Sequence, residues 1–142
     1  MHVKLKKLNE DAVVPSYQSF GASGFDFHST ESLAILPGDT KLIPTGLAFE
    51  IPVFYELQVR PRSGLSLKTN LRVTNSPGTV DADFRGEVKI IMQNTGTHTE
   101  YISKGDRIAQ GVICPIIQAV FQVVEELGDT ERGAGGFGST GK

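Results

Sequence analysis

The stretch Tyr55–Arg60, YELQVR, alternates polar and apolar side chains. An alternation with a period of two puts every second side chain on the same face of an extended chain, so this stretch predicts a strand with one buried face. A second stretch shows the same pattern on one face, at Val88, Ile90 and Met92. These two stretches point to a fold built from half-buried strands.

Further short segments rich in apolar and β-branched residues are separated by turn signals. The chain contains 16 Gly and 7 Pro, and this punctuation of short strands is typical of an all-β sandwich or small barrel. One short helix is expected at Ser63–Lys68, with Ser63 as its cap. The other strand candidates are Val3–Leu8, Leu33–Leu36, Lys41–Ile51, Thr97–Ile102 and Arg107–Ile117.

The C-terminal part is harder to assign. Val120, Val123, Val124 and Leu127 fit a helical stripe, but their Val and Phe surroundings favour a strand. Composition changes at Gly128, because the last fifteen residues hold six Gly and few apolar side chains. We therefore expect a β core over residues 1–127 and a flexible Gly-rich arm over residues 128–142.

Length and charge exclude several classes of protein. The chain has 142 residues, which suits one domain, and its formal net charge of −2 argues against a nucleic-acid partner. Its one cysteine, Cys114, allows neither an internal disulfide nor a structural zinc site. With no long apolar run and no signal-peptide pattern, the expectation is a cytoplasmic protein with no membrane partner.

The arm sequence Arg132–Lys142 is the first candidate for chemistry. Its glycines let backbone amides converge on an anion, and Phe137 is a lone aromatic that could cover a bound group. A floppy terminus is the competing interpretation. A P-loop is a third, because Gly136 and Lys142 have the required spacing, but no Ser or Thr follows Lys142.

Two more segments carry polar groups in suggestive order. Arg60–Ser66 brings an arginine, a hydroxyl and free amides to the start of the expected helix, which suits a phosphate, although a capped helix with a solvated arginine has the same pattern. Asn75–Glu87 predicts a tight hairpin followed by Asp81 and Asp83 on one side of an extended chain. These carboxylates could bind a metal, act as a base or belong to a turn.

The three histidines have no ligand spacing, and no GxSxG is present, which argues against a zinc enzyme or a serine hydrolase.

Taken together, these segments resemble the five ordered motifs of the homotrimeric dUTPases, which hydrolyse dUTP to dUMP and pyrophosphate. The resemblance runs from about Ser19 to the C-terminus, and five motifs in the right order are specific where each alone is weak. It implies a jelly-roll-like β fold and a role in keeping uracil out of DNA while supplying dUMP for dTMP synthesis. The matching stretches are GASGFDF (21–27), PRSGLSLK (61–68), NSPGTVDADFRGE (75–87), GDRIAQ (105–110) and RGAGGFGSTG (132–141).

The resemblance also assigns residues by their position in the motifs. Asp81 corresponds to the carboxylate that activates the attacking water, and Asp26 to an acid that reaches a water on Mg²⁺. The positions that match uracil and deoxyribose contacts are Asn75, Gly78, Val80, Phe84 and Phe137. The positions that match phosphate contacts are Arg62, Ser63, Gly64, Gln110, Arg132, Gly138, Ser139 and Thr140.

One residue departs from the family pattern, which more often has Tyr where this chain has Phe84. A phenyl ring still leaves a ribose 2′-hydroxyl without a partner, so selection of deoxyribose is expected to persist. The resemblance further implies a homotrimer with sites shared between subunits and the arm acting on a neighbour. A dCTP deaminase and a non-catalytic nucleotide-binding module are the alternatives, and intact Asp81, Arg62 and Arg132 argue against the second.

Overall fold

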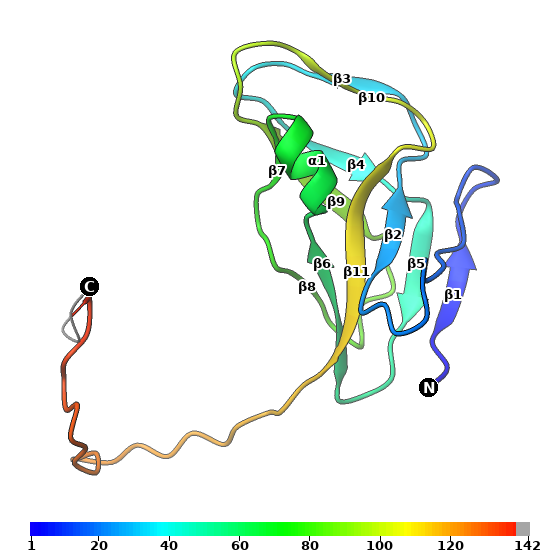
Figure 1. Cartoon of the computed structure of the whole chain (residues 1–142). Coiled ribbons are helices and arrows are strands. Elements are labelled where there is room, and N and C mark those ends of the chain that lie inside the picture. The colour runs from blue at the N-terminus through cyan, green and yellow to red at the C-terminus, as the bar shows by residue number, and fades with distance from the viewer. Residues whose placement is uncertain (139–142) are drawn as a thin grey trace.

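The computed structural model describes residues 1–138 and is almost entirely β in that range (Figure 1). The strands are β1 (Lys4–Lys7), β2 (Phe25–His28), β3 (Leu33–Ile35), β4 (Thr40–Pro44), β5 (Leu47–Glu50), β6 (Tyr55–Arg60), β7 (Leu71–Val73), β8 (Gly78–Val80), β9 (Lys89–Asn94), β10 (Glu100–Ile102) and β11 (Arg107–Pro115). The helix is α1 (Ser63–Lys68), with the bounds expected from the sequence. The prediction of an all-β fold with one short helix is confirmed.

The strands pair antiparallel in four small sheets. The largest has the order β2-β11-β6-β8, and a second has the order β4-β9-β7. The pairs β1-β5 and β10-β3 complete the set, so most neighbours in space are distant in sequence, as in a jelly-roll-like barrel. The alternating stretches supply the core as expected, since Leu57, Val59, Val88, Ile90 and Met92 are all buried.

Several local expectations were wrong. Ser63 does not cap α1: it is the first helical residue, and the extended Arg62 precedes it with no side-chain capping bond. The expected strand Lys41–Ile51 is two strands, because the chain turns at Gly46, whose φ of +66° favours glycine. Finally, the segment before Asp81 does not close a hairpin. β7 pairs with β9 whereas β8 pairs with β6, so Asn75–Pro77 crosses from one sheet to the other.

After β11 the chain leaves the body of the protein (Figure 1). The Ile116 amide donates to the Phe54 carbonyl at 2.8 Å, and the residues that follow extend away from the sheets. The strand favoured for Val120–Leu127 is not formed, and no helix is formed there either. Most apolar side chains of this segment are exposed, because nothing in the described part of the chain covers them. No helix within residues 1–138 is long and apolar enough to cross a membrane.

Candidate active site

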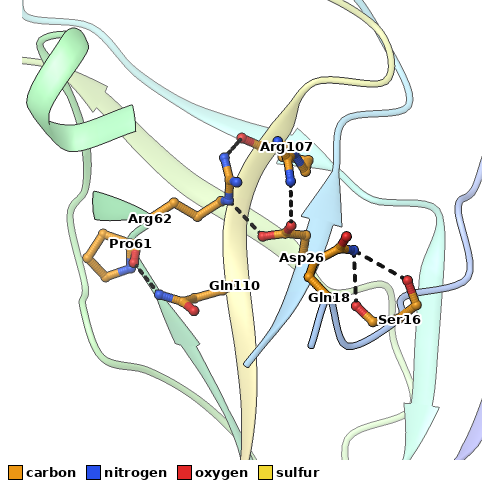
Figure 2. Close-up of polar contacts among 7 residues, drawn as sticks. All are labelled: Ser16, Gln18, Asp26, Pro61, Arg62, Arg107 and Gln110. Atoms are coloured by element: carbon orange, nitrogen blue, oxygen red, sulfur yellow. Dashed lines mark hydrogen bonds and ion pairs between the residues drawn. The ribbon is translucent and has the colours of Figure 1, made fainter. Parts of the chain in front are cut away.

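A buried carboxylate lies between two arginines at one end of the largest sheet. Asp26, on β2, is 9% exposed. The Arg62 Nε donates to its Oδ1 at 2.7 Å, and the Arg107 Nη1 donates to its Oδ2 at 3.2 Å (Figure 2). Arg62 also donates through Nη1 to the Arg107 carbonyl at 3.2 Å. These contacts join the end of β6 to β2 and β11, and we call Asp26, Arg62, Arg107 and Gln110 the arginine cluster.

The register of the sheet explains why these residues meet. Gln110 on β11 lies opposite both Asp26 on β2 and Arg60 on β6, so these three residues form one row across the three strands. Its side-chain amide donates to the Pro61 carbonyl at 2.9 Å (Figure 2). A Cβ at position 24 would lie 2.6 Å from the Gln110 Oε1, so a larger residue at this position would displace the end of the Gln110 side chain.

The arginine cluster carries more positive than negative charge, since two guanidinium groups share one carboxylate. This surplus suits an incoming anion such as a phosphate. His28, across from Arg107, adds no further charge at neutral pH: burial lowers its pKa below 6.5, Asp26 opposes the shift, and the charges of Arg107 and Arg62 lower the pKa further. Ser63 and Gly64 follow Arg62 at the start of α1.

A second group of expected residues lines a cavity of about 350 Å³. It contains the candidate base and four of the five residues expected to contact uracil and sugar, namely Asp81, Asn75, Gly78, Val80 and Phe84. Thr79, between Gly78 and Val80, also lines it. Sequence reasoning missed the rest of the wall, which consists of Leu42, Val59, Glu87, Val88, Lys89 and Ile91. We call this space the Asp81 cavity.

The backbone turns immediately after β8. The Phe84 amide donates to the Asp81 carbonyl at 3.2 Å, so Asp81 and Asp83 do not lie along an extended chain as expected. Beyond the turn, the Glu87 carboxylate accepts a hydrogen bond from the Gly46 amide at 2.8 Å and lies 3.4 Å from the Lys89 ammonium. The segment that carries Asp81 is thereby fixed at its far end to the turn between β4 and β5.

Within one chain, the two groups lie apart. Val80 is opposite Leu57, three residues before Arg60 on β6, and Asp26 lies three strands away from β8. With strands about 4.8 Å apart and residues about 3.3 Å apart along a strand, the backbones at Asp26 and Val80 are separated by roughly 17 Å. The arginine cluster and the Asp81 cavity of the same chain therefore do not form one compact site.

The expected residues of the arm are elsewhere again. The Arg132 Nε donates to the Gly135 carbonyl at 2.7 Å, and Phe137 is fully exposed. Gly138 has a φ of +93° and makes the next turn of the arm. The candidates Ser139 and Thr140 lie outside the described residues. Within residues 1–138, the arm makes no hydrogen bond to the arginine cluster or to the residues of the Asp81 cavity.

The arginine cluster fits a magnesium ion that is held mainly by the phosphate oxygens of a bound molecule and by water. No three His, Cys, Asp or Glu side chains in residues 1–138 are grouped to hold a metal. Asp26 already accepts from two arginines, but a carboxylate offers about four lone-pair sites, so it can also accept from a water on a metal. Mg²⁺ prefers phosphate oxygens and retained waters, which suits a single indirect carboxylate.

Comparison with known proteins gives one consistent match. The dUTPase family model covers residues 10–141. The deoxyuridine 5′-triphosphate nucleotidohydrolase of Nautilia profundicola is 57% identical over 142 residues, covering 100% of both chains. That of Bdellovibrio bacteriovorus is 56% identical and covers 99% of this chain and 96% of its own.

Solved structures agree with the sequence comparison. The Staphylococcus bacteriophage 80alpha dUTPase with dUpNHpp superposes with a TM-score of 0.94, at 30% identity and 99% coverage of both chains. A dUTPase variant from phage phi11 of S. aureus, described with a structural Mg(II) ion, has a TM-score of 0.84 at 27% identity. It covers 89% of this chain and 98% of its own.

Proposed function

Because this chain belongs to the dUTPase family and is a dUTP-hydrolysing enzyme, we propose that its active site combines the Asp81 cavity, the arginine cluster and the Gly-rich arm. The reaction removes dUTP, a DNA precursor that carries uracil, and yields dUMP. The observation that carries the proposal is that Asp81, Asn75, Gly78, Val80 and Phe84 line one cavity.

We assign uracil and deoxyribose to the Asp81 cavity. Uracil and thymine differ by one methyl group, which a tolerant pocket distinguishes by only about 1–3 kcal/mol, so discrimination requires a wall that excludes the methyl. The compact crossing at Asn75 and Gly78 suits that task, and its backbone amides and carbonyls can select uracil over cytosine by hydrogen bonding. Phe84 covers the sugar and leaves a 2′-hydroxyl unpaired, while Phe137 of the arm stacks over the base.

Asp81 is the general base for in-line attack of water on the α-phosphorus. Its carboxylate takes a proton from the attacking water, whose oxygen forms a bond to the α-phosphorus. The bond between that phosphorus and the bridging oxygen breaks, and this oxygen leaves with pyrophosphate. A carboxylate is a weak base, so most of the acceleration comes from positioning and from stabilisation of charge. Closure of the arm excludes bulk water and completes the arrangement.

The triphosphate is the ligand of the arginine cluster. Arg62, Ser63, Gly64 and Gln110 contact its phosphates, and the arm adds Arg132, Gly138, Ser139 and Thr140. A Mg²⁺ ion on the phosphates would supply neutralisation of charge and would stabilise the leaving pyrophosphate. Asp26 would hold that ion through a water, while Arg62 and Arg107 keep the Asp26 carboxylate in place.

A homotrimer brings the two groups together. Asp81 acts at the α-phosphorus and Asp26 at the hydrated ion on the phosphates, so both must reach the same triphosphate, and a backbone separation of roughly 17 Å within one chain is too long for that. A second copy that offers its arginine cluster to the first copy's Asp81 cavity resolves this separation. The exposed apolar side chains of residues 117–127 then pack on a neighbour, and the arm over residues 128–142 closes on the shared site.

A pyrophosphate-release assay with dUTP, dTTP, dCTP and UTP, with and without Mg²⁺, tests the reaction. We expect release from dUTP alone, stimulated by Mg²⁺, and ammonia release from dCTP would instead identify a deaminase. Sharing of sites is tested by mixing two inactive chains, Asp81→Asn and a chain cut before Arg132. If sites are shared between subunits, the mixture regains activity that neither chain has alone. A mixture that stays inactive although mixed oligomers form contradicts shared sites.

A further inference from the structure

The exposed side chain of Arg85 hydrogen-bonds to the backbone of its own loop, Asp81–Gly86. The Arg85 Nη1 donates to the Ala82 carbonyl at 2.7 Å and to the Phe84 carbonyl at 3.1 Å. Together with the hydrogen bond from the Phe84 amide to the Asp81 carbonyl, these contacts tie the backbone of the loop to itself. One guanidinium therefore bonds the backbone on both sides of Asp83.

The ring of Phe84 is seated on the same loop. A Cβ at Gly86 would lie 2.6 Å from the Phe84 Cζ and 3.0 Å from its Cε2, so the ring lies directly against the backbone there. Glycine is required at position 86 for this contact. The conformation of the loop consequently sets where the phenyl ring points as well as where the Asp81 carboxylate lies.

Arg85 is also near a fixed negative charge outside the loop. Arg85 and Glu50, at the end of β5, line two adjoining cavities together. The Lys4 Nζ donates to the Glu50 Oε1 at 2.9 Å. This hydrogen bond and the charge of Lys4 lower the pKa of Glu50, and the charge of Arg85 lowers it further. The guanidinium thus bonds the loop carbonyls within the field of a carboxylate of the β1-β5 sheet, although it makes no ion pair with that carboxylate.

We propose that Arg85 is a positioning residue that fixes Asp81 against the α-phosphorus and Phe84 against the sugar. The inference rests on the proposed function of the Asp81 cavity. Its physical basis is that a base must be held precisely relative to the reacting atom, since a displacement of about 1 Å can reduce a rate on the order of 100-fold. Without the guanidinium, two loop carbonyls turn to water and the loop gains alternative conformations.

Arg85→Ala, Arg85→Lys and a control, Arg72→Ala, test the proposal. Arg72 makes the same kind of contact elsewhere, since its Nη1 donates to the Thr69 and Leu71 carbonyls at 2.9 and 2.8 Å. We expect Arg85→Ala to lower kcat for dUTP on the order of 10- to 100-fold and to lower the ratio of kcat/KM for dUTP over UTP. Arg85→Lys recovers part of the kcat and part of the preference for dUTP over UTP, because an ammonium still donates to a carbonyl. Arg72→Ala changes neither the kcat nor this preference.

A merely structural arginine gives a different result. In that case Arg85→Ala lowers the melting temperature, but the folded enzyme keeps its kcat and its preference for dUTP over UTP, and the proposal is overturned. If Arg85→Ala does not fold, Arg85→Gln and Arg85→Lys supply the same two measurements. Asp81→Asn in the same series separates the two hypotheses. Normal turnover in Asp81→Asn contradicts the assignment of the base, whereas normal behaviour of Arg85→Ala beside an inactive Asp81→Asn contradicts only the positioning role.

Discussion

Arg62 and Asp26 are 36 residues apart in sequence, yet the Arg62 Nε donates to the Asp26 Oδ1 at 2.7 Å (Figure 2). This contact ties the residue that precedes α1 to β2, at the edge of the largest sheet. Because the Asp26 side chain is only 12% exposed, its negative charge matters to both arginines around it. The same carboxylate therefore contributes to folding and, in the proposed site, to binding of the hydrated metal.

Asp26→Asn should weaken both contributions. The amide keeps the shape of the side chain but leaves two guanidinium groups without a countercharge, so we expect a loss of about 1–3 kcal/mol in the free energy of unfolding, measured by urea denaturation. The Mg²⁺ concentration needed for half-maximal activity should rise. Asp11→Asn is the matched control, since Asp11 forms an exposed ion pair with Lys104, and a pair of that kind contributes below about 1 kcal/mol. Equal losses in both variants would contradict a special role for Asp26.

Asp81→Asn should separate binding from turnover. Removing a general base typically lowers kcat on the order of 100- to 10,000-fold, whereas the cavity walls that hold uracil and sugar stay intact. Titration calorimetry with dUpNHpp should therefore give an affinity within a few-fold of the unaltered chain. Asp83→Asn removes a neighbouring carboxylate from the same turn and should keep most of the turnover. A larger defect in Asp83→Asn than in Asp81→Asn would reverse the assignment.

Alternation of polar and apolar residues predicted the strands that are long enough to show a period of two. β6 and β9 each span six residues, and their alternation was legible. β7 and β8 have three residues each, too few to show a period, and both were missed, whereas the equally short β3 and β10 lie within segments that the apolar content and turn signals predicted as strands. The inward face of β9 also implied that Lys89 and Ile91 point outward, and this signal could have identified them as part of the Asp81 cavity wall.

The sequence did not predict which strands pair with one another. Arg107 joins the arginine cluster because β11 pairs with β2 in a register that includes a shift between Arg107 and Ala109, and no local pattern shows this. Similarly, the apolar side chains of Val120–Leu127 show that the segment needs a partner. The sequence alone could not reveal that no other segment among the described residues covers these side chains. Such contacts depend on the arrangement of whole strands or of other subunits.

His28 should make the protein less stable in mild acid. Its pKa in the folded chain is lowered, chiefly by burial, and its Nδ1 is buried without a hydrogen-bond partner among the described residues. Below pH 6.5 the unfolded chain takes up a proton that the folded chain resists, so stability is complete above pH 6.5 and falls as pH drops towards the lowered pKa. His28→Gln should flatten this part of a curve of melting temperature between pH 7.5 and 5. His98→Gln, at an exposed site, controls for loss of a histidine, and an unchanged slope in His28→Gln would contradict the prediction.

Removing residues 132–142 should leave the fold intact and disable the enzyme. All the hydrogen bonds that the structure gives to residues 128–138 stay within the arm, so the truncated chain should keep its melting temperature within about 2 °C. In the proposed site the same truncation removes Arg132, Phe137 and the amides around the triphosphate, and leaves the reacting phosphorus open to water. We expect kcat/KM for dUTP to fall on the order of 100-fold or more. Phe137→Ala isolates the stacking contribution and should raise KM more than it lowers kcat, because a ring over uracil contributes to binding of substrate and transition state alike. Full activity of the truncated chain would show that the arm is an unstructured end with no part in catalysis.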